Sequence, residues 1–265
     1  SSQDINTNAF VFDQHQELVL DSNGNPLRRP AGHGTLLQNL ETIQSPYVLV
    51  KNIDNIQHFS QRQPSNANWE FLLGLQIEVR NALRQFVLSE DLTGFKLWNQ
   101  TFGLLDPTQL DKLTLNEWKA LLNRPLRICG MVRNDGQPGG GPFFVEMNGA
   151  ASKQIVEKAQ LNGHPEASKL MLQSAYFNPV LMVLSPCDLT DKPLPLQQFA
   201  DPNAYFVVEK NQGGERVYFV EQPGLWNGAM ANWNTLFVEV PSAVFSPVKS
   251  AVDLLDISHQ ANKGA

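Results

Sequence analysis

A short glycine motif near the N-terminus has the composition of a ligand-binding loop. Gly32, His33 and Gly34 stand directly before leucines at helical spacing, and this pattern predicts a loop that opens a short helix. Glycines let a ligand approach the backbone, and exposed amides at a helix start can hold a phosphate or the edge of a base. The alternative interpretation is a plain tight turn, which the motif by itself favours.

A carboxylate follows a strand predicted over residues 47–50. That strand leads into Asn52, Asp54 and Asn55, and open α/β sheets place ligand groups at such strand ends. A carboxylate in this position can bind a hard divalent cation, which prefers oxygen ligands. Alternatively, the Asp and Asn side chains only cap the following turn. The residues by themselves leave both interpretations open.

Two cationic side chains stand in settings that suit an anionic ligand. Arg133 precedes a loop that contains Gly139 and Gly140, and a cation beside exposed backbone amides can bind an anion. Lys249 follows Pro247, which stiffens the chain, and a positioned lysine can act as a point charge on phosphate. The alternatives are a surface hairpin for the first and an ordinary surface lysine for the second.

Several other chemistries lack their sequence signatures. The histidines show no HxxxH or HxH spacing that would indicate zinc, and no GxSxG nucleophile motif is present. Neither a Walker-type GxxxxGK[ST] loop nor a GxGxxG fingerprint occurs. Covalent hydrolase and zinc chemistry therefore have no support, and the remaining candidates are sites that position a ligand.

Charge and composition narrow the class of protein. Against 26 acidic residues the chain has 20 Lys plus Arg, so its formal charge is 20 − 26 = −6, which argues against binding a nucleic-acid backbone. Cys129 and Cys187 are too few for a disulfide scaffold and favour a reduced intracellular protein. No apolar run approaches the roughly 18 residues of a membrane span. We therefore predict a cytoplasmic protein that binds neither membranes nor nucleic acids.

The elements that must position these residues alternate between strands and helices. Amphipathic spacing predicts helices over residues 69–88 and 107–123. Trp226, Trp233 and Phe237 are predicted as core. The pattern is that of a mixed α/β protein in one body. Further strands are predicted over residues 126–132, 143–147, 154–157, 175–184, 205–209, 216–220 and 235–240.

Taken in order, these motifs resemble the UDP-sugar pyrophosphorylases, nucleotidyltransferases of GT-A-like α/β fold. The early pieces look like that family's P-G-H-G and N-x-D-N motifs, and the late ones like its F-x-P-V-K and D-L-L ending. The chain looks most like an uncharacterised bacterial family that is distantly related to these enzymes. The pieces that carry the resemblance are residues 30–34, 52–55, 139–140, 154–161, 176–178, 245–249 and 253–255.

The resemblance implies a fold and an activity. The fold would be a GT-A-like nucleotidyltransferase sheet flanked by helices, as a single domain over residues 1–265 with a helical insertion at 60–123. The activity would be Mg²⁺-dependent transfer of UMP from UTP to a sugar 1-phosphate, with release of pyrophosphate. The ligands would be UTP or a UDP-sugar and a sugar 1-phosphate. The alternative is a non-catalytic nucleotide-sugar-binding or regulatory protein of the same fold.

The resemblance also assigns roles to individual residues. Nucleotide-binding residues would be Gly32, His33, Gly34 and Asn52. Sugar-binding residues would be Gly139, Gly140, Glu157 and Asn178. Phosphate-binding residues would be Arg133 and Lys249, the metal ligand would be Asp54, and the catalytic pair would be Asp54 and Lys249.

Two departures from the family pattern stand out. The opening L-x-x-G-x-G-T-R-x-G loop, which cradles the triphosphate in the family, does not occur in this sequence. We therefore expect the chain to be the C-terminal portion of a longer protein, with the missing N-terminal segment as a partner. In addition, the family's F-N-T-N-N stretch is here Phe177, Asn178 and then Pro179.

Overall fold

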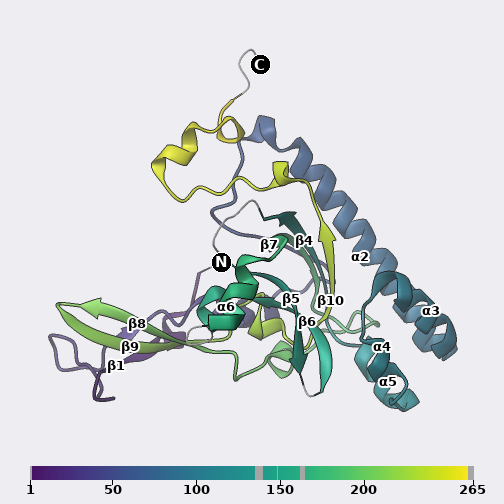
Figure 1. Ribbon diagram of the computed structural model, residues 1–265, viewed down its shortest axis with the longest axis horizontal. Helices are drawn as coiled ribbons and strands as arrows, with labels where there is room; N and C mark the ends of the chain where they lie inside the picture. Colours follow the sequence, from purple (N-terminus) through teal and green to yellow (C-terminus); the bar gives the residue numbers. More distant parts are fainter. Residues whose placement is uncertain (1, 135–139, 148, 162–164, 262–265) are drawn as a thin grey trace. The chain divides into compact units, whose positions relative to one another are not determined.

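The computed structural model describes residues 2–134, 140–147, 149–161 and 165–261 (Figure 1). Contacts divide the chain, which we predicted to form one body, into two compact units. The first unit consists of Ser1–Gln44, Val156–Pro165 and Pro195–Asn232. The second unit consists of Ser45–Ile155, Glu166–Leu194 and Trp233–Ala265. Each unit is therefore assembled from segments that lie far apart in the sequence.

The first unit is built on an antiparallel sheet in the order β2-β1-β9-β8. Val217 and Phe219 alternate along β9 and so point to the same face, where they pack with Val11 of β1 as the core of this unit. A short helix follows the glycine motif, as predicted. The elements are β1 (Ala9–Asp13), β2 (Arg28–Arg29), α1 (Leu36–Glu41), β8 (Phe206–Gln212) and β9 (Glu215–Glu221).

The hairpin between β8 and β9 is formed by two glycines. Gln212 pairs with Glu215, so Gly213 and Gly214 form a two-residue loop. Both glycines have positive φ, of 64° and 93°, and a loop of this length that matches the twist of the strands requires that conformation. The local sequence therefore determines the register of the two strands.

The second unit contains a sheet in the order β10-β4-β7-β3. β10 runs parallel to β4, whereas β7 is antiparallel to both β4 and β3. A separate hairpin of β5 and β6 belongs to the same unit. The strands are β3 (Val48–Lys51), β4 (Leu126–Arg133), β5 (Gly141–Met147), β6 (Ala150–Val156), β7 (Tyr176–Ser185) and β10 (Asn234–Glu239).

Helix α2 (Gln63–Ser89) covers the sheet of the second unit (Figure 1). Its fully buried residues Leu72, Val79 and Leu83 belong to the same core as the apolar residues of β4 and β7. Gly130 of β4 permits this approach, because a Cβ atom there would lie 3.0 Å from Leu72 Cδ1. The remaining helices of the second unit are α3 (Leu92–Phe102), α4 (Pro107–Leu110), α5 (Leu115–Leu122) and α6 (Pro165–Leu172).

The helix predicted over residues 107–123 is two helices, so that prediction was wrong. Thr114 caps α5, because its hydroxyl accepts from the Glu117 amide while the Glu117 carboxylate accepts from the Thr114 amide. This capping box begins a new helix at residue 115. The Thr-x-x-Glu signal was present in the sequence, but the apolar spacing across 107–123 concealed it. Helices α2 to α5 together occupy the span 60–123 for which an insertion was predicted.

Most predicted strands are confirmed within a few residues, and the mixed α/β class is confirmed with them. The strand at 47–50 was expected to be buried, but β3 is an edge strand and half of Leu49 is exposed. Helices α3 and α6 were not predicted from the sequence. Leu18 and Leu20 form only isolated bridges. Trp233 is buried as predicted, whereas Trp226 is only partly buried.

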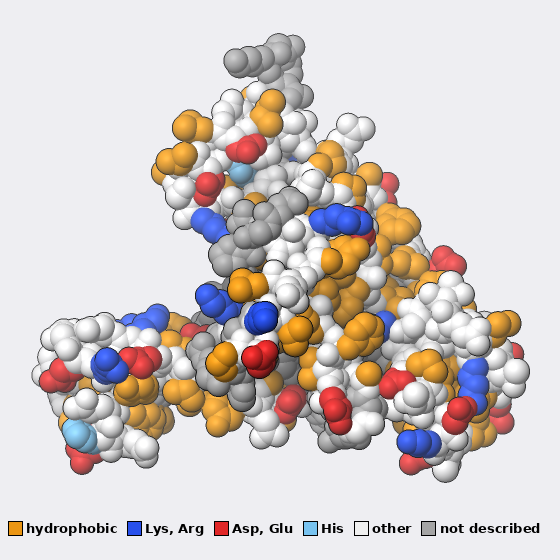
Figure 2. Space-filling model, in the orientation of Figure 1, with side chains coloured by type: hydrophobic (Ala, Val, Ile, Leu, Met, Phe, Trp, Pro, Cys, Tyr) orange, Lys and Arg blue, Asp and Glu red, His pale blue; other side chains and the backbone are white. Residues whose placement is uncertain are grey.

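The C-terminal segment of the second unit consists of two short 3₁₀ turns, η8 (Ala251–Leu255) and η9 (Ile257–His259). The His58 amide donates to the Ser258 carbonyl at 2.9 Å and anchors the segment. Exposed apolar side chains gather on it at the top of Figure 2. Within the described ranges, no helix is both long and apolar enough to cross a bilayer.

Candidate functional site

The first unit gathers residues from three distant segments around His33, and we call Gly32, His33, Glu157, Glu221 and Trp226 the glycine-loop cluster. The His33 ring stacks on Trp226 with centroids 4.7 Å apart and planes at 23°. His33 Nε2 lies 3.7 Å from Glu157 Oε1, and the Trp226 side chain also hydrogen-bonds to Glu157. The cluster therefore combines an aromatic platform with carboxylates.

Backbone crowding makes glycine necessary in this loop. Gly32 has φ of 79°, a conformation that favours glycine, and a Cβ atom there would lie 2.8 Å from Glu221 Oε2. A Cβ atom on Gly34 would overlap the carbonyl oxygen of Pro223. The two glycines thus allow the loop to pack against residues 221–223, which is a structural requirement separate from any contact with a ligand.

The hydrogen bonds of His33 determine its tautomer. The Leu225 amide donates to His33 Nδ1 at 2.9 Å, so Nδ1 carries the lone pair and the proton of the neutral ring is on Nε2, facing Glu157. Burial lowers the pKa of His33 and favours this neutral form. Burial, together with the nearby Glu221 charge, raises the pKa of Glu157. The cluster thus presents one neutral imidazole and two adjacent carboxyl groups.

In the second unit, an early and a late motif of the family resemblance meet, at residues 52–55 and 245–249. The Asp54 carbonyl accepts from the Val248 amide at 2.7 Å. Asn55 is 1% exposed; its Oδ1 accepts from the Ser246 amide at 2.9 Å, and its Nδ2 donates to the Val244 carbonyl at 3.2 Å. Asn55 and Pro247 form a β-bridge. We call the loop at residues 52–55 together with the segment at 245–249 the strand-end site.

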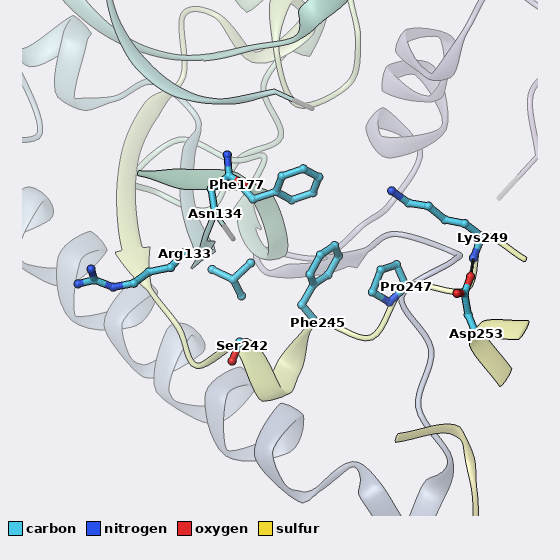
Figure 3. A pocket seen from close by; sticks show the side chains of 9 residues that line it. Arg133, Asn134, Phe177, Ser242, Phe245, Pro247, Lys249 and Asp253 are labelled. Atoms are coloured by element: carbon cyan, nitrogen blue, oxygen red, sulfur yellow. Dashed lines mark hydrogen bonds between the residues drawn. The ribbon is translucent and has the colours of Figure 1, made fainter. Parts of the chain in front are cut away.

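A cavity of about 320 Å³ adjoins this strand-end site. Phe177 and Phe245 contribute its aromatic wall, with ring centroids 5.4 Å apart (Figure 3). Lys249 extends towards the cavity from the side opposite Arg133 (Figure 3). The residues that line the cavity are Val132, Arg133, Asn134, Phe177, Ser242, Phe245, Pro247, Lys249 and Asp253.

The two predicted phosphate-binding cations differ in their partners. The Lys249 backbone amide donates to the Asp253 carboxylate at 2.8 Å, and in the described residues the Lys249 ammonium forms no ion pair. The Arg133 guanidinium points away from the cavity (Figure 3) and forms two contacts with Glu239, at 3.0 and 3.3 Å. Tyr176 donates to the same carboxylate at 2.7 Å. Lys249 is thus the cation that remains available to a ligand.

A single carboxylate is present at the predicted metal position. Asp54 is partly exposed, and the described residues contain no cluster of three His, Cys, Asp or Glu side chains suited to a metal ion. Mg²⁺ is commonly held by one or two carboxylates together with water and substrate phosphates. Asp54 therefore fits a magnesium site that a phosphate ligand completes, and the assignment stays a prediction.

The predicted sugar-binding residues belong to both units. Glu157 is in the glycine-loop cluster, whereas Asn178 and Gly140 are in the second unit. Among the described residues, the buried Oδ1 of Asn178 has no hydrogen-bond partner. It precedes Pro179, at a point where the β4–β7 register shifts, which is a position that tolerates a residue without an amide hydrogen. Gly140 is buried, and Gly139 lies outside the described residues.

Three residues of these sites, Glu221, Trp226 and Phe177, were not predicted from the sequence by their own chemistry. Trp226 was predicted as core, and neither Glu221 nor Phe177 was given a role from its own chemistry. Their positions follow from tertiary contacts with segments more than 60 residues away in the sequence.

The described fold is a mixed α/β protein with a cavity at its strand ends. A family model described as "Domain of unknown function (DUF4301)" matches residues 1–260, and the chain belongs to this family. The predicted identification with an uncharacterised family is therefore confirmed. No curated protein matches the chain.

Solved structures similar to the chain include UDP-glucose pyrophosphorylases. A mutant of the Leishmania major enzyme in complex with UDP-glucose is 18% identical, with a TM-score of 0.45 over 92% of this chain and 46% of that chain. A second mutant of that enzyme, also with UDP-glucose, gives 18% identity and a TM-score of 0.47 over 95% and 46%. The Trypanosoma brucei UDP-glucose phosphorylase is 17% identical, with a TM-score of 0.35 over 54% and 31%. The chain thus spans less than half the length of these proteins.

Proposed function

We propose that this chain contributes a nucleotide-sugar site to a Mg²⁺-dependent nucleotidyltransferase that transfers UMP from UTP to a sugar 1-phosphate. The observation that supports this function is the strand-end site. Its two halves are 191 positions apart between Asn55 and Ser246, yet buried hydrogen bonds hold them together beside a cavity that Lys249 lines. A GT-A-like sheet belongs to the same proposal.

The chemistry requires charge neutralisation and positioning more than an acid–base pair. An oxygen of the sugar 1-phosphate attacks the α-phosphorus of UTP in line, and pyrophosphate leaves. Lys249 acts as a point charge on the phosphates. Asp54 would hold Mg²⁺, which neutralises phosphate charge when bound. The buried Asn55 keeps the Asp54 loop and the Lys249 segment in a constant relative position.

The glycine-loop cluster of the first unit is proposed to bind uncharged groups, a base or a sugar. The backbone of Gly32 and Gly34 would contact the base, and Glu157 would accept hydrogen bonds from sugar hydroxyls. Two neighbouring carboxyl groups, Glu157 and Glu221, repel phosphate. The charge of the cluster therefore favours the base and the sugar over the phosphates as its ligands.

Ligand-induced stabilisation tests this proposal, because a ligand that binds the native state raises its stability. The shift in melting temperature is measured with UTP, UDP-glucose, UDP-N-acetylglucosamine and their adenine counterparts, with and without Mg²⁺. We expect a Mg²⁺-dependent shift that is selective for a uridine compound. Asp54→Asn is expected to remove the Mg²⁺-dependent part of the shift in melting temperature. It is expected to change the free energy of unfolding of the ligand-free chain by less than about 0.5 kcal/mol.

A matched pair of cation variants identifies the phosphate-binding residue. Lys249→Gln is expected to weaken UTP binding at least tenfold, whereas Arg133→Gln is expected to stay within twofold because its guanidinium contacts Glu239. Equal losses in both variants would contradict the assignment to Lys249. Pyrophosphate release, measured with UTP and sugar 1-phosphates, separates the enzyme from the alternative: binding without turnover would indicate a non-catalytic nucleotide-sugar-binding protein.

A further inference from the structure

The backbone around Lys249 is fixed at three consecutive amides. The Val248 amide donates to the Asp54 carbonyl at 2.7 Å. The Lys249 amide donates to the Asp253 carboxylate at 2.8 Å, and the Ser250 amide donates to the same carboxylate at 2.7 Å. These hydrogen bonds remove backbone freedom on both sides of the lysine. The stem of the Lys249 side chain therefore begins at a constant place.

Asp253 binds the backbone of Lys249 and not its ammonium group. Its Oδ2 accepts from the two amides and from the Ser250 hydroxyl, the last at 3.2 Å. In the described residues, no ion pair joins this carboxylate to Lys249. Figure 3 shows the Lys249 side chain extending away from Asp253. The carboxylate thus holds the lysine in place and leaves its positive charge unpaired.

The local fold explains why the carboxylate and the ammonium do not pair. On an α-helix, a carboxylate four residues after a lysine lies beside the lysine side chain. Here Asp253 belongs to the 3₁₀ turn η8 and forms a capping box with Ser250, which folds its carboxylate back over the start of the turn. Lys249 directly precedes that cap. Its amide therefore meets the carboxylate while its side chain leaves in another direction.

Hydrogen bonding also keeps the acceptor charged. The bonds from the Ser250 and Lys249 amides lower the pKa of Asp253, because they stabilise the ionised form. An ionised carboxylate is a stronger acceptor than a neutral oxygen. The same charge repels phosphate. Asp253 thus has two opposite effects on an anionic ligand of the cavity, one through the backbone of Lys249 and one through its own charge.

We infer that Asp253 is a positioning residue for the phosphate contact of Lys249, because it fixes the lysine backbone beside the cavity without neutralising the ammonium. Both residues line that cavity. A lysine is a point charge on a flexible stem, and a cation that is already positioned loses less freedom when the ligand binds. The inference rests on the proposed function, since it takes nucleotide phosphate as the ligand of Lys249.

Two substitutions separate the backbone contact from the charge. Asp253→Asn keeps an oxygen acceptor for the amides and removes the negative charge, whereas Asp253→Ala removes both. The Kd for UTP is measured by calorimetric titration of the full chain with Mg²⁺ at constant ionic strength. We expect Asp253→Ala to raise the Kd about tenfold and Asp253→Asn to stay within about twofold of the unaltered chain. Tighter binding in both variants would show that only the charge matters and would overturn the inference.

A positioning role also requires that the effect depend on the lysine. The Lys249→Gln chain has no ammonium to position, so adding Asp253→Ala to it is expected to change the Kd by less than about twofold. A loss of equal size with and without Lys249 would show that Asp253 acts on the fold in general, and would overturn the inference.

Asp256 provides a matched control in the next turn of the same segment. It is a capping residue of the same kind, since its Oδ1 accepts from the Ser258 amide at 3.0 Å and from the Ser258 hydroxyl at 3.1 Å. Asp256 is not among the described residues that line the cavity of Lys249. Asp256→Ala is therefore expected to leave the Kd for UTP within about twofold. A loss as large as that of Asp253→Ala would contradict a specific role of Asp253.

Hydrogen exchange of the ligand-free chain measures the backbone contact without a nucleotide. Protection of the Lys249 and Ser250 amides is expected to fall in Asp253→Ala and to persist in Asp256→Ala. Unchanged protection in Asp253→Ala would overturn the inference.

The inference and the proposed function fail in different measurements. UTP binding that Lys249→Gln weakens and Asp253→Ala leaves unchanged would overturn the inference alone. Absence of UTP binding by the unaltered chain would overturn the proposed function and, with it, the phosphate contact, whatever the exchange of the Lys249 amide shows.

Discussion

The glycine-loop cluster and the strand-end site achieve their geometry in different ways. In the first unit, Gly34 allows two stretches of backbone to touch, and His33 and Trp226 stack beside that contact. In the second unit, the side chain of Asn55 bonds to three backbone groups in two other segments, at Val180 and at residues 244–246. One site therefore depends on the absence of side chains, and the other on one buried side chain that holds distant segments together.

This difference determines how each site responds to substitution. Backbone contact leaves no room for adjustment, so a single added methyl group at Gly34 acts on the fold of the first unit. A hydrogen-bonding amide can be removed without steric conflict, so loss of Asn55 leaves unpaired groups and a loosened segment. The predictions that follow test this comparison.

The largest effect is expected from Gly34→Ala. Its Cβ would overlap the Pro223 carbonyl, so we expect a loss of about 3 kcal/mol in the free energy of unfolding of the first unit. The measurement is urea denaturation. Gly74→Ala on α2 is the matched control, since its Cβ would meet no atom within 4 Å and alanine in a helix interior contributes up to about 1 kcal/mol of stability. If Gly34→Ala instead lost nucleotide affinity at unchanged stability, the glycine would serve the ligand directly.

An intermediate effect is expected from Asn55→Ala. The change leaves the Ser246 amide and the Val244 carbonyl without their buried partner, which costs about 2 kcal/mol. Unfolding in urea measures the loss, and protection of the Ser246 amide from hydrogen exchange is expected to fall with it. Asn52→Ala, at a partly exposed position of the same loop, is the control and is expected to stay within about 0.5 kcal/mol. Similar losses at both positions would mean that Asn55 does not hold the segments together.

The smallest effect is expected in the first unit, as a change in how steeply its free energy of unfolding varies with pH. Burial lowers the pKa of His33 in the folded state, so the unfolded state binds more protons below the ordinary value of about 6.5, and stability falls as pH drops below that value. The pKa of Glu157 is raised, so its contribution is complete below its ordinary value and is lost as pH rises through its folded pKa. His33→Gln should therefore flatten the rise in stability towards pH 6.5, and Glu157→Gln should steepen it. Urea denaturation between pH 4.5 and 7 measures both slopes, and an unchanged slope in His33→Gln would contradict the neutral, buried ring.

Local chemistry was enough to predict much of this protein. Apolar spacing predicted α2 and most of the sheet strands, and glycines before leucines predicted the loop that opens α1. These predictions succeeded because a helix or strand that is buried on one face has apolar residues at regular intervals. That spacing can be read from residues a few positions apart in the sequence. The prediction of one helix in place of α4 and α5 failed because the apolar spacing continues across a capping box.

The candidate sites required the tertiary structure. The order of the motifs indicated that residues 52–55 and 245–249 belong together, but the buried amide of Asn55 that joins them is a contact between segments 191 positions apart. Likewise, only folding shows that Arg133 is held by Glu239 while Lys249 remains available. The sequence by itself determined which residues can bind phosphate, sugar or metal. Which of those groups are partnered, and which face a cavity, was decided by long-range packing, because hydrogen bonds and charges depend on distances that sequence spacing does not contain.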